Sequence, residues 1–339
     1  MKEDLVYIII LNWNGWQDTI ECLESVFRNN YSNYKVIVCD NDSHDGSLDK
    51  IKNWAEGKIQ TSISSNIRSS KCTYSFVNKP IAYIEYTREQ AEIGKLCDEE
   101  SSLILIQTGA NLGYAGGNNV GLRYALRKEF DYIWLLNNDT VIEENSLVYL
   151  IDKMKINSSI GMCGSTVFYY DEPNTVQAFG GATYNKFTGI PKLYNKSDGI
   201  NFPKEDMVEK KIYYILGASM LVSKKFLRDI GLISEDYFLY HEEIDWITRA
   251  KGRYKIAYAS KSIIYHKEGG STGSNHNMRK SSFLSDYHMI KNRLIFTKKF
   301  FPYLLPTVYL CLLVTLFNRM RRGQWDRVKM VIKIMLFQA

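Results

Sequence analysis

The segment DYIWLLNNDT, Asp131 to Thr140, decides the fold because an apolar run ends directly in polar residues. Tyr132 to Leu136 has the composition of a buried strand, and Asn137, Asn138 and Asp139 follow without a break. In open α/β folds, ligands bind at the edge formed by the carboxyl ends of the strands. A carboxylate there can hold a divalent cation against a diphosphate. The segment therefore predicts a strand that ends at a ligand site, although Asn and Asp are also ordinary turn residues.

Around this segment, the first half of the chain alternates between strand-like and helix-like stretches. Strand-like runs occupy residues 6–14, 34–42 and 103–111. Apolar residues with helical spacing occur at 16–29, 47–54 and 118–128. This alternation predicts an α/β protein with a mostly parallel sheet and right-handed crossovers. Residues 57–102 interrupt the alternation, and we interpret them as an insertion or as an excursion of loop and hairpin.

The middle of the chain has a different composition. Residues 161–217 are rich in aromatic residues, glycine and β-branched residues, which favours a smaller mixed sheet packed over the first one. A helix is expected to begin near Glu242, and KIAYASKSIIYH at 255–266 is expected to form a further strand. The predicted body therefore combines two sheets with surrounding helices.

Length and composition indicate a globular protein. The chain has 339 residues, of which 45% are hydrophobic and 24% are charged, enough for one large domain or two smaller ones. Its six cysteines form no CxxC pair, which predicts reduced thiols in the cytoplasm rather than disulfides or a zinc site. The start, MKEDLVYIIILNWN, places two acids before a short apolar run and predicts a first strand rather than a signal peptide.

The C-terminal tail carries most of the positive charge. The net charge of the chain is +6, and residues 291–339 hold ten Lys and Arg but one acid. A basic tail on a slightly acidic body predicts an anionic partner, either membrane lipid or nucleic acid. The basic residues flank apolar runs instead of forming a groove-like cluster, which argues against nucleic acid.

One run in this tail is apolar enough to suggest a membrane. The 18 residues from Phe300 to Phe317 carry no charge, a length at the border for a spanning helix, and Pro302 and Pro306 interrupt their start. We expect this helix to lie in or dip into the cytoplasmic leaflet, with 325–337 as a second, basic amphipathic helix. The alternative is an apolar helical hairpin that packs on the body or on a partner subunit.

Polar residues also end the first two predicted strands. Asn12 and Asn14 lie in ILNWNG at 10–15, where their amides can bind a base or ribose or can simply form a turn. Asp40 ends the second strand, where a carboxylate can accept hydrogen bonds from a nucleotide, as acids do in dinucleotide folds. Asp42 is typical of a turn or a helix cap and carries less weight.

A glycine-rich stretch, ANLGYAGGNNVGL at 110–122, lies between a predicted strand and a predicted helix. Glycine lets backbone amides approach a ligand, and a helix N-terminus favours phosphate. Asn111, Gly117 and Asn118 are therefore candidate donor-binding residues, and a plain glycine-rich turn is the alternative. The spacing of the glycines differs from the dinucleotide fingerprint GxGxxG.

Two motifs carry candidates for acid–base and metal chemistry. HEEIDW at 241–246 places three acids in four positions at a predicted helix start. Such acids complement the helix dipole, yet like charges raise each other's pKa, and a carboxyl with a raised pKa suits a general base. Glu243 and Asp245 are the candidates. His266 ends a predicted strand in YHKEGGST at 265–272, where a histidine is either structural or a metal ligand.

Together and in this order, these motifs resemble the family 2 nucleotide-sugar glycosyltransferases, with the rhamnosyltransferase-type enzymes of bacterial polysaccharide assembly as the most similar subgroup. The similarity extends over about residues 5–297 and includes YHMIKNRLIF at 287–296. It implies a GT-A fold, with a Rossmann-like, mostly parallel central sheet and a smaller mixed sheet. We expect a catalytic domain over 1–297 and a helical membrane-associating or packing segment over 298–339.

The resemblance implies roles for the residues at the strand ends. Asp40 matches an aspartate that contacts the base and ribose of the donor. Asn137, Asn138 and Asp139 match the DxD motif of the family, with Asp139 at the metal-binding position. The neutral Asn137 stands where relatives have the first carboxylate, so the predicted metal affinity rests more heavily on Asp139.

The resemblance implies roles for the later motifs as well. Glu242 and Glu243 match an acidic pair whose second member is the catalytic base, here a glutamate instead of an aspartate. Asp245 is the alternative base. His266 matches a histidine that in some relatives binds the metal or contacts the diphosphate.

The implied reaction is a sugar transfer with inversion at the anomeric carbon. The expected donor is a dTDP- or UDP-sugar, with rhamnose as one candidate, and the expected acceptor is a saccharide or a lipid-linked saccharide. The cofactor is a divalent metal, Mn²⁺ or Mg²⁺. We expect the protein at the cytoplasmic face of the inner membrane, with no nucleic-acid partner, and it could act as an oligomer.

Two other functions fit parts of the pattern. A nucleotidyltransferase shares the sheet and the acidic edge, but its phosphate loop is normally rich in glycine and basic residues, and NWNGWQD at 12–18 carries no base. An inactive sugar- or membrane-binding module is consistent with the neutral Asn137. The three acids at 242, 243 and 245 argue against such decay.

Overall fold

The computed structural model describes residues 3–59, 77–95, 101–195, 202–267 and 282–337. Its strands are β1 (Val6–Asn12), β2 (Tyr34–Asp40), β3 (Tyr83–Thr87), β4 (Leu103–Gln107), β5 (Tyr132–Asn137), β6 (Thr140–Ile142), β7 (Ile160–Tyr169), β8 (Val176–Phe179), β9 (Gly181–Asn185), β10 (Ile190–Leu193), β11 (Tyr214–Ile215), β12 (Ser219–Ser223) and β13 (Lys255–His266). Its α-helices are α1 (Trp16–Val26), α2 (Ser47–Ala55), α4 (Arg88–Glu92), α5 (Gly113–Leu126), α6 (Ser146–Lys155), α7 (Glu205–Glu209), α8 (Lys224–Ile230), α9 (Glu242–Ala250), α10 (Phe283–Phe300), α11 (Leu305–Arg321) and α12 (Trp325–Phe337).

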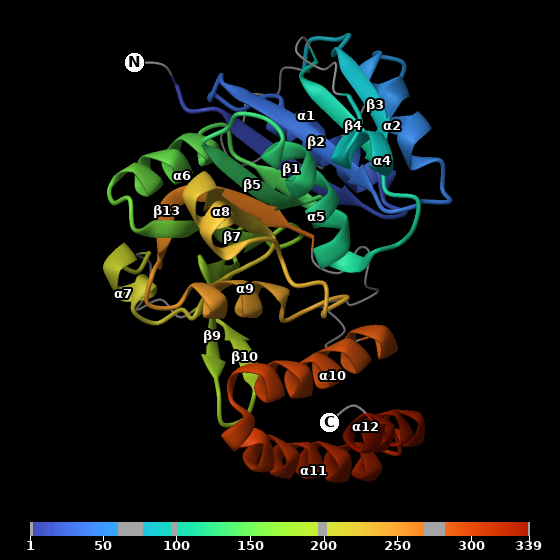
Figure 1. Cartoon of the computed structure of the whole chain (residues 1–339), viewed down its shortest axis with the longest axis vertical. Coiled ribbons are helices and arrows are strands. Elements are labelled where there is room, and N and C mark those ends of the chain that lie inside the picture. The colour runs from blue at the N-terminus through green and yellow to red at the C-terminus, as the bar shows by residue number, and fades with distance from the viewer. Residues whose placement is uncertain (1–2, 60–76, 96–100, 196–201, 268–281, 338–339) are drawn as a thin grey trace.

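A ten-stranded sheet forms the centre of the molecule, in the order β3-β4-β2-β1-β5-β12-β7-β13-β6, with β8 beside β7 (Figure 1). The strands β3, β4, β2, β1 and β5 are all parallel, as the alternating pattern predicted. Successive side chains of β1 point to opposite faces of the sheet, so Ile8 and Ile10 join one core cluster and Tyr7 and Ile9 join the other. Helices cover both faces, which explains why these strands are apolar throughout.

The predicted smaller sheet is present in the middle of the chain, but it is antiparallel and takes up only part of residues 161–217. Strands β7, β8 and β12 instead extend the central sheet, and a small antiparallel sheet contains β10, β9 and β11. The reason is visible in β7, where the first eight residues are all buried. A strand that is apolar on both faces belongs inside a covered sheet rather than over one.

Helix α5 begins at Gly113, five residues before the predicted start at Asn118. The glycine-rich stretch is therefore helix rather than an open loop. A methyl group added at Gly117 would lie 2.4 Å from Cδ1 of Leu11, and one added at Gly121 would lie 2.9 Å from Cγ2 of Ile9. Glycine disfavours a helix interior, but here it lets α5 pack closely against β1.

The described part of 57–102 is not an independent unit. Strand β3 pairs in parallel with β4 and forms the edge of the central sheet. Helix α4 follows directly, and Thr87 and Gln90 form a capping box at its start. The remaining part of this predicted insertion, at 60–76 and 96–100, lies outside the described residues.

The C-terminal helices form a folded unit attached to the body. Helices α10, α11 and α12 share an apolar cluster that includes Leu294, Leu312 and Val331. Arg319 donates two hydrogen bonds to Asp286, which ties α11 to α10. Figure 1 shows α10 between the body and α11, and the predicted domain boundary after residue 297 falls inside α10. Among the described residues, Pro302–Arg321 is the one helix long and apolar enough to cross a membrane, and 17% of its apolar window is buried.

Candidate active site

The ends of β1, β2 and β5 lie side by side, as predicted. Asn12 is opposite Asp40 in the β1–β2 pair, and Leu11 is opposite Asn137 in the β1–β5 pair. Asn12 donates a hydrogen bond to Asp40 at 2.6 Å and accepts one from Thr19 at 2.7 Å. Asn138 donates to Thr19 at 3.0 Å, which completes a buried chain from Asp40 to the end of β5. Asn12 therefore positions its neighbours.

Two other candidates at this edge are more accessible. Asn14 is exposed and Asp42 is half-buried, and both have a positive φ, 49° and 63°. Asn14 accepts a hydrogen bond from the amide of His44 at 2.8 Å, and its own amide donates to Ser43 at 2.9 Å. Asp40 also accepts from the amide of Ser43, at 2.9 Å. These bonds fix a polar rim around the mouth of the edge.

The start of α5 does not offer free amides to a phosphate. The amide of Leu112 donates to Asn41, that of Gly113 donates to Asn111, and that of Tyr114 donates to the carbonyl of Phe238. Asn111 is exposed, while Gly117 and Asn118 are buried inside the helix. Asn118 donates to the carbonyl of Tyr114 at 3.0 Å. The structure therefore gives Gly117 and Asn118 roles in helix packing.

Asp139 and His266 meet beyond the end of β5. Oδ1 of Asp139 lies 3.2 Å from Nε2 of His266, and both residues are buried. Nδ1 of His266 lies 2.9 Å from Oε1 of Gln177, an atom that only accepts, so Nδ1 carries the hydrogen in the neutral ring. The lone pair of Nε2 then faces a carboxylate oxygen, and this arrangement is stable only with a proton or a metal cation between them.

The residue after His266 fixes this turn in place. The amide of Lys267 donates to the carbonyl of Asp139 at 3.0 Å. Its ammonium group lies 2.5 Å from both Asp18 and Glu21 of α1. Burial by itself would raise the pKa of Asp139, but the charges of His266 and Lys267 outweigh burial and lower it. Asp139 is therefore ionised at neutral pH, as a metal ligand must be.

The pair of residues is an incomplete but suitable metal site. Among the described residues, no group of three His, Cys, Asp or Glu side chains converges. Mg²⁺ is commonly bound through one or two protein ligands, with substrate phosphates and water completing the shell. One carboxylate and one imidazole fixed by Gln177 fit that pattern. The glycine-rich loop after His266 lies outside the described residues.

The acidic motif begins helix α9 after a strained turn. Tyr240 and His241 have φ of 69° and 76°, a left-handed backbone conformation that residues other than glycine rarely adopt. The buried side chain of Asn292, on α10, donates to the carbonyls of Leu239 and Tyr240 at 2.8 and 2.9 Å. Strain of this kind persists only when surrounding contacts hold it, and α10 supplies them here.

Glu243 has the pKa of a general base. Burial raises its pKa to about 7, although the backbone amide of Gly217 donates a hydrogen bond that opposes this shift. Burial, and then the charge of Glu243, also raises the pKa of Glu242. The sequence predicted raised values from mutual repulsion, whereas burial is the larger cause. Tyr114 donates to the carbonyl of Gly217 at 2.9 Å, and a methyl group at Gly217 would lie 2.5 Å from Oε1 of Glu243.

A short backbone link joins Glu243 to the end of β5. Gly217, which contacts Glu243, is followed by Ala218, whose carbonyl accepts a hydrogen bond from the amide of Asn137 at 3.2 Å. The acidic pair and the polar triplet were far apart in the sequence. The fold brings them to the same edge of the sheet through β12.

Asp245, the alternative base, is fully buried in an ionic cluster. It lies 2.7 Å from Arg249 and 2.8 Å from Lys299, and Tyr237 donates a hydrogen bond to it at 3.1 Å. A carboxylate with two cationic partners and no exposed surface is a structural group. It ties α9 to the end of α10.

Several residues of this site were not predicted. Lys267 follows a residue that the sequence singled out, and Asn292 lies in YHMIKNRLIF, so the motifs pointed near both. Gln177 carries no signal in the sequence, since a single glutamine in a strand is ordinary. The others are buried polar or glycine positions whose partners are distant in the chain, namely Thr19, Asn41 and Gly217.

The raised pKa of Glu243 predicts the pH dependence of any reaction in which it accepts a proton. Because the carboxylate is the active form, kcat/KM should rise about tenfold per pH unit below about 7 and level off above it. The measurement is kcat/KM at constant metal concentration over about two pH units on either side. A rate that does not change with pH across this range would contradict the assignment.

The chain matches a known family and known folds. The model of glycosyl transferase family 2 matches residues 7–69 and 86–231. The chain is 28% identical over 163 residues to the low-salt glycan biosynthesis hexosyltransferase Agl10 of Haloferax volcanii. This match covers 48% of the chain and 50% of Agl10, so the chain spans about half the length of this curated relative.

Solved structures resemble the whole chain at low identity. The mannosyltransferase PcManGT from Pyrobaculum calidifontis, in complex with GDP-Man and Mn²⁺, has a TM-score of 0.55 and 11% identity, and the match covers 99% of this chain and 86% of PcManGT. Residues 1–349 of S. aureus TarS have a TM-score of 0.50 and 13% identity, over 97% of this chain and 80% of that chain. At these identities the likeness shows the fold alone.

Proposed function

The chain belongs to glycosyl transferase family 2, and we propose that it is an inverting sugar transferase. It takes a sugar, with rhamnose as one candidate, from a nucleotide diphosphate and transfers it to a hydroxyl of a saccharide or lipid-linked saccharide. The reaction serves cell-surface polysaccharide synthesis. The fold is GT-A, and the protein is a glycosyltransferase that uses a nucleotide-sugar donor. The observation that carries the proposal is Glu243, a half-buried carboxyl with a pKa of about 7, linked through Gly217 and Ala218 to the edge with Asp139.

The proposed reaction is a single displacement. Glu243 takes the proton of the acceptor hydroxyl as that oxygen bonds to the anomeric carbon. The bond between this carbon and the donor diphosphate breaks at the same time, and the nucleoside diphosphate leaves with the electron pair. Attack from the face opposite the leaving group inverts the configuration, because no second displacement restores it.

Asp139 and His266 would hold a divalent cation, Mn²⁺ or Mg²⁺, at the diphosphate. When bound, such an ion neutralises charge on the leaving group. Gln177 orients the imidazole, and Lys267 holds the turn that carries Asp139. Asn137 adds no charge, so Asp139 supplies the single carboxylate of this pair. Manganese in the complex of PcManGT is consistent with this assignment.

We assign the nucleotide to the polar rim at the ends of β1 and β2. Asp40, held by Asn12 and by the amide of Ser43, would accept hydrogen bonds from the base or ribose. Asn14, Asp42 and Asn111 are the accessible residues beside it. The family match argues against a nucleotidyltransferase and against a module without activity.

A panel of nucleotide sugars tests the proposed donor class. Thermal unfolding is measured with dTDP-rhamnose, UDP-hexoses and GDP-mannose, each with and without Mn²⁺. A donor at about 100 times its Kd should raise Tm by a few degrees, because it binds only the folded state. We expect this rise with one nucleotide and only in the presence of metal. Equal effects of all nucleotides, or none, would contradict the proposal.

We also propose that the tail places the enzyme on the cytoplasmic membrane surface. Leu310, Val314 and Phe317 follow helical spacing on α11 and are 60–63% exposed. Arg321, Arg322 and other basic residues near the ends of α11 and α12 are exposed too. An apolar helix face beside exposed cations suits a surface of anionic lipid.

Flotation with anionic vesicles tests this placement. The triple variant Leu310→Ser, Val314→Ser and Phe317→Ser should reduce partitioning at least roughly 10²-fold, because full burial of each apolar side chain contributes about 1.5–3 kcal/mol and 60–63% of each is exposed here. The matched control is Ile93→Ser with Ile156→Ser, which removes two exposed apolar side chains from the body. If the triple variant floats with the vesicles as well as the unchanged protein does, the membrane proposal is wrong.

A further inference from the structure

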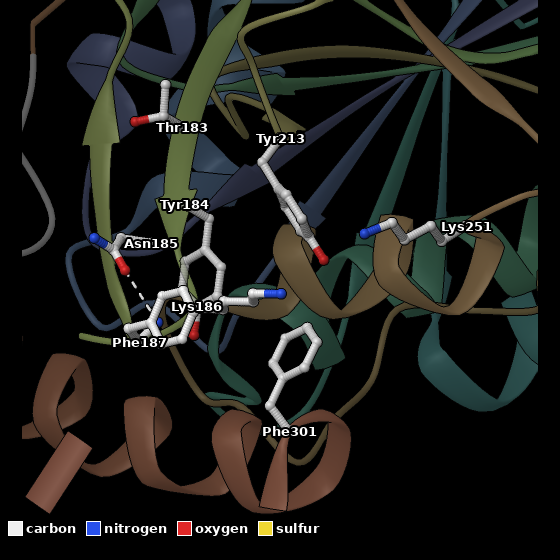
Figure 2. Close-up of a pocket in the computed structure, with 8 residues that line it drawn as sticks. All are labelled: Thr183, Tyr184, Asn185, Lys186, Phe187, Tyr213, Lys251 and Phe301. Atoms are coloured by element: carbon white, nitrogen blue, oxygen red, sulfur yellow. Dashed lines mark hydrogen bonds between the residues drawn. The ribbon is translucent and has the colours of Figure 1, made fainter. Parts of the chain in front are cut away.

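A groove of about 600 Å³ lies at the C-terminal end of α9, apart from the edge that carries Asp139 (Figure 2). The aromatic side chains of Tyr184, Tyr213 and Phe301 form its walls. Lys186 and Lys251 line it from opposite sides, and Figure 2 shows their ammonium groups reaching toward each other. Aromatic walls with two cations are a combination suited to an anionic ligand with an apolar or sugar portion.

The two lysines have no acidic partner in the groove. Among the described residues, no carboxylate lines the groove. None of their carboxylates lies within 4.0 Å of the ammonium group of Lys186 or Lys251. Lys251 lies over the ring of Tyr213 at 5.2 Å, and Lys186 lies over the ring of Phe187 at 5.5 Å. These ring contacts keep both cations at the groove while leaving their hydrogen-bond donors available.

The groove stands between the acidic pair and the apolar tail. Tyr213 shares a hydrogen bond of 3.2 Å with Thr248 of α9, the helix that begins with Glu242 and Glu243. Lys251 caps the other end of α9, eight residues after Glu243, which is roughly 12 Å along the axis. A ligand group held at Lys251 thus lies about two sugar residues away from Glu243.

The opposite end of the groove meets the start of α11. Phe301 lies just before that helix, and Thr307 of α11 donates a hydrogen bond to the carbonyl of Phe187 at 2.8 Å. Tyr303, next to the groove, is 69% exposed, and the exposed face of α11 continues through Leu310. An apolar chain that leaves the groove at this end therefore finds a continuous apolar surface.

We propose that this groove binds the phosphate or diphosphate of a lipid-linked acceptor, with Lys186 and Lys251 on the anion and the lipid chain leading along α11. The inference rests on the proposed function, since it assigns the acceptor of the same reaction. It requires a cationic site beside an apolar exit, and the groove has both. A soluble saccharide would use neither the lysines nor the exit.

Calorimetry on the full chain tests the groove, with farnesyl diphosphate as the probe. The variant Lys186→Gln with Lys251→Gln should weaken its binding at least about tenfold, because two charge-assisted contacts are lost. The matched control is Lys192→Gln, an exposed lysine of β10 outside the groove, and it should bind as the unchanged protein does. Farnesol and inorganic diphosphate should both bind much more weakly, because each lacks half of the ligand.

Several outcomes would overturn the proposal. If the double variant binds farnesyl diphosphate normally, the lysines do not form the site. If farnesol binds as tightly, the groove recognises only the apolar chain, and if inorganic diphosphate does, the ligand is a free anion. Binding of the nucleotide sugar with Mn²⁺ is measured in every variant and should not change. If the unchanged protein does not bind the nucleotide sugar with Mn²⁺, the proposed function is refuted instead. This measurement therefore separates a failure of the groove proposal from a failure of the proposed function.

Discussion

Replacing Glu243 with glutamine is expected to lower kcat by about 10²- to 10⁴-fold, the contribution of a well-placed general base. The amide keeps the shape of the side chain but cannot accept the proton of the acceptor hydroxyl. Donor binding should persist, because the nucleotide edge at β1, β2 and β5 is unchanged. Single-turnover transfer and donor affinity, measured on the same preparation, separate these two effects.

Two neighbouring substitutions make this test specific. Glu242→Gln removes the adjacent buried carboxyl and should cost far less activity if Glu243 alone is the base. Asp245→Asn should lower stability, since it leaves Arg249 and Lys299 without a buried carboxylate, and its activity should recover at lower temperature. Near-normal transfer by Glu243→Gln together with permanent loss in Asp245→Asn would show that the base assignment is wrong.

Replacing Asp139 with asparagine is expected to weaken metal-dependent donor binding by roughly 10²-fold, a loss at the upper end of those caused by removing groups around metal ligands. The change keeps the volume but removes the carboxylate that lies 3.2 Å from His266. Calorimetry with the donor, in Mn²⁺ and in chelator, measures the effect. Binding in chelator should be weak for both proteins and nearly equal.

The neutral residue of the triplet provides the converse experiment. Asn137→Asp places a carboxylate at the first position of the DxD motif that this triplet resembles. It should tighten Mn²⁺ binding if Asn137 faces the same ion as Asp139. Donor affinity that is the same with metal and with chelator in the unchanged protein would remove the metal from the proposal.

The strand ends were predictable because they depend on local patterns. An apolar run followed by Asn137, Asn138 and Asp139 specifies a strand and its exit within ten residues, and parallel pairing then places Asp40 and Asn12 beside it. His266 was found for the same reason, since it ends β13 at the same edge. The glycine-rich stretch misled because close helix packing and loop flexibility both select glycine, as Gly117 shows.

The remaining features depend on contacts between distant segments. Asp245 and Glu243 are equivalent in the sequence, and only their contacts in the fold, such as those of Asp245 with Lys299 and Arg249, distinguish them. The pKa of Glu243 reflects burial against β11 and β12, which no local pattern reports. The extent of the small sheet was not predictable, because the apolar character of β7 indicates burial without saying which sheet contains the strand.

The contacts of α10 also decide how the chain can be shortened for expression. Asn292 holds the turn before α9 and Lys299 pairs with Asp245, so a version that stops before residue 292 would lose both sets of contacts along with the tail. Ending after Phe301 removes α11 and α12 but uncovers Ile290 and Leu294 on α10. Polar substitutions at those two positions would be needed to keep such a truncated protein from aggregating.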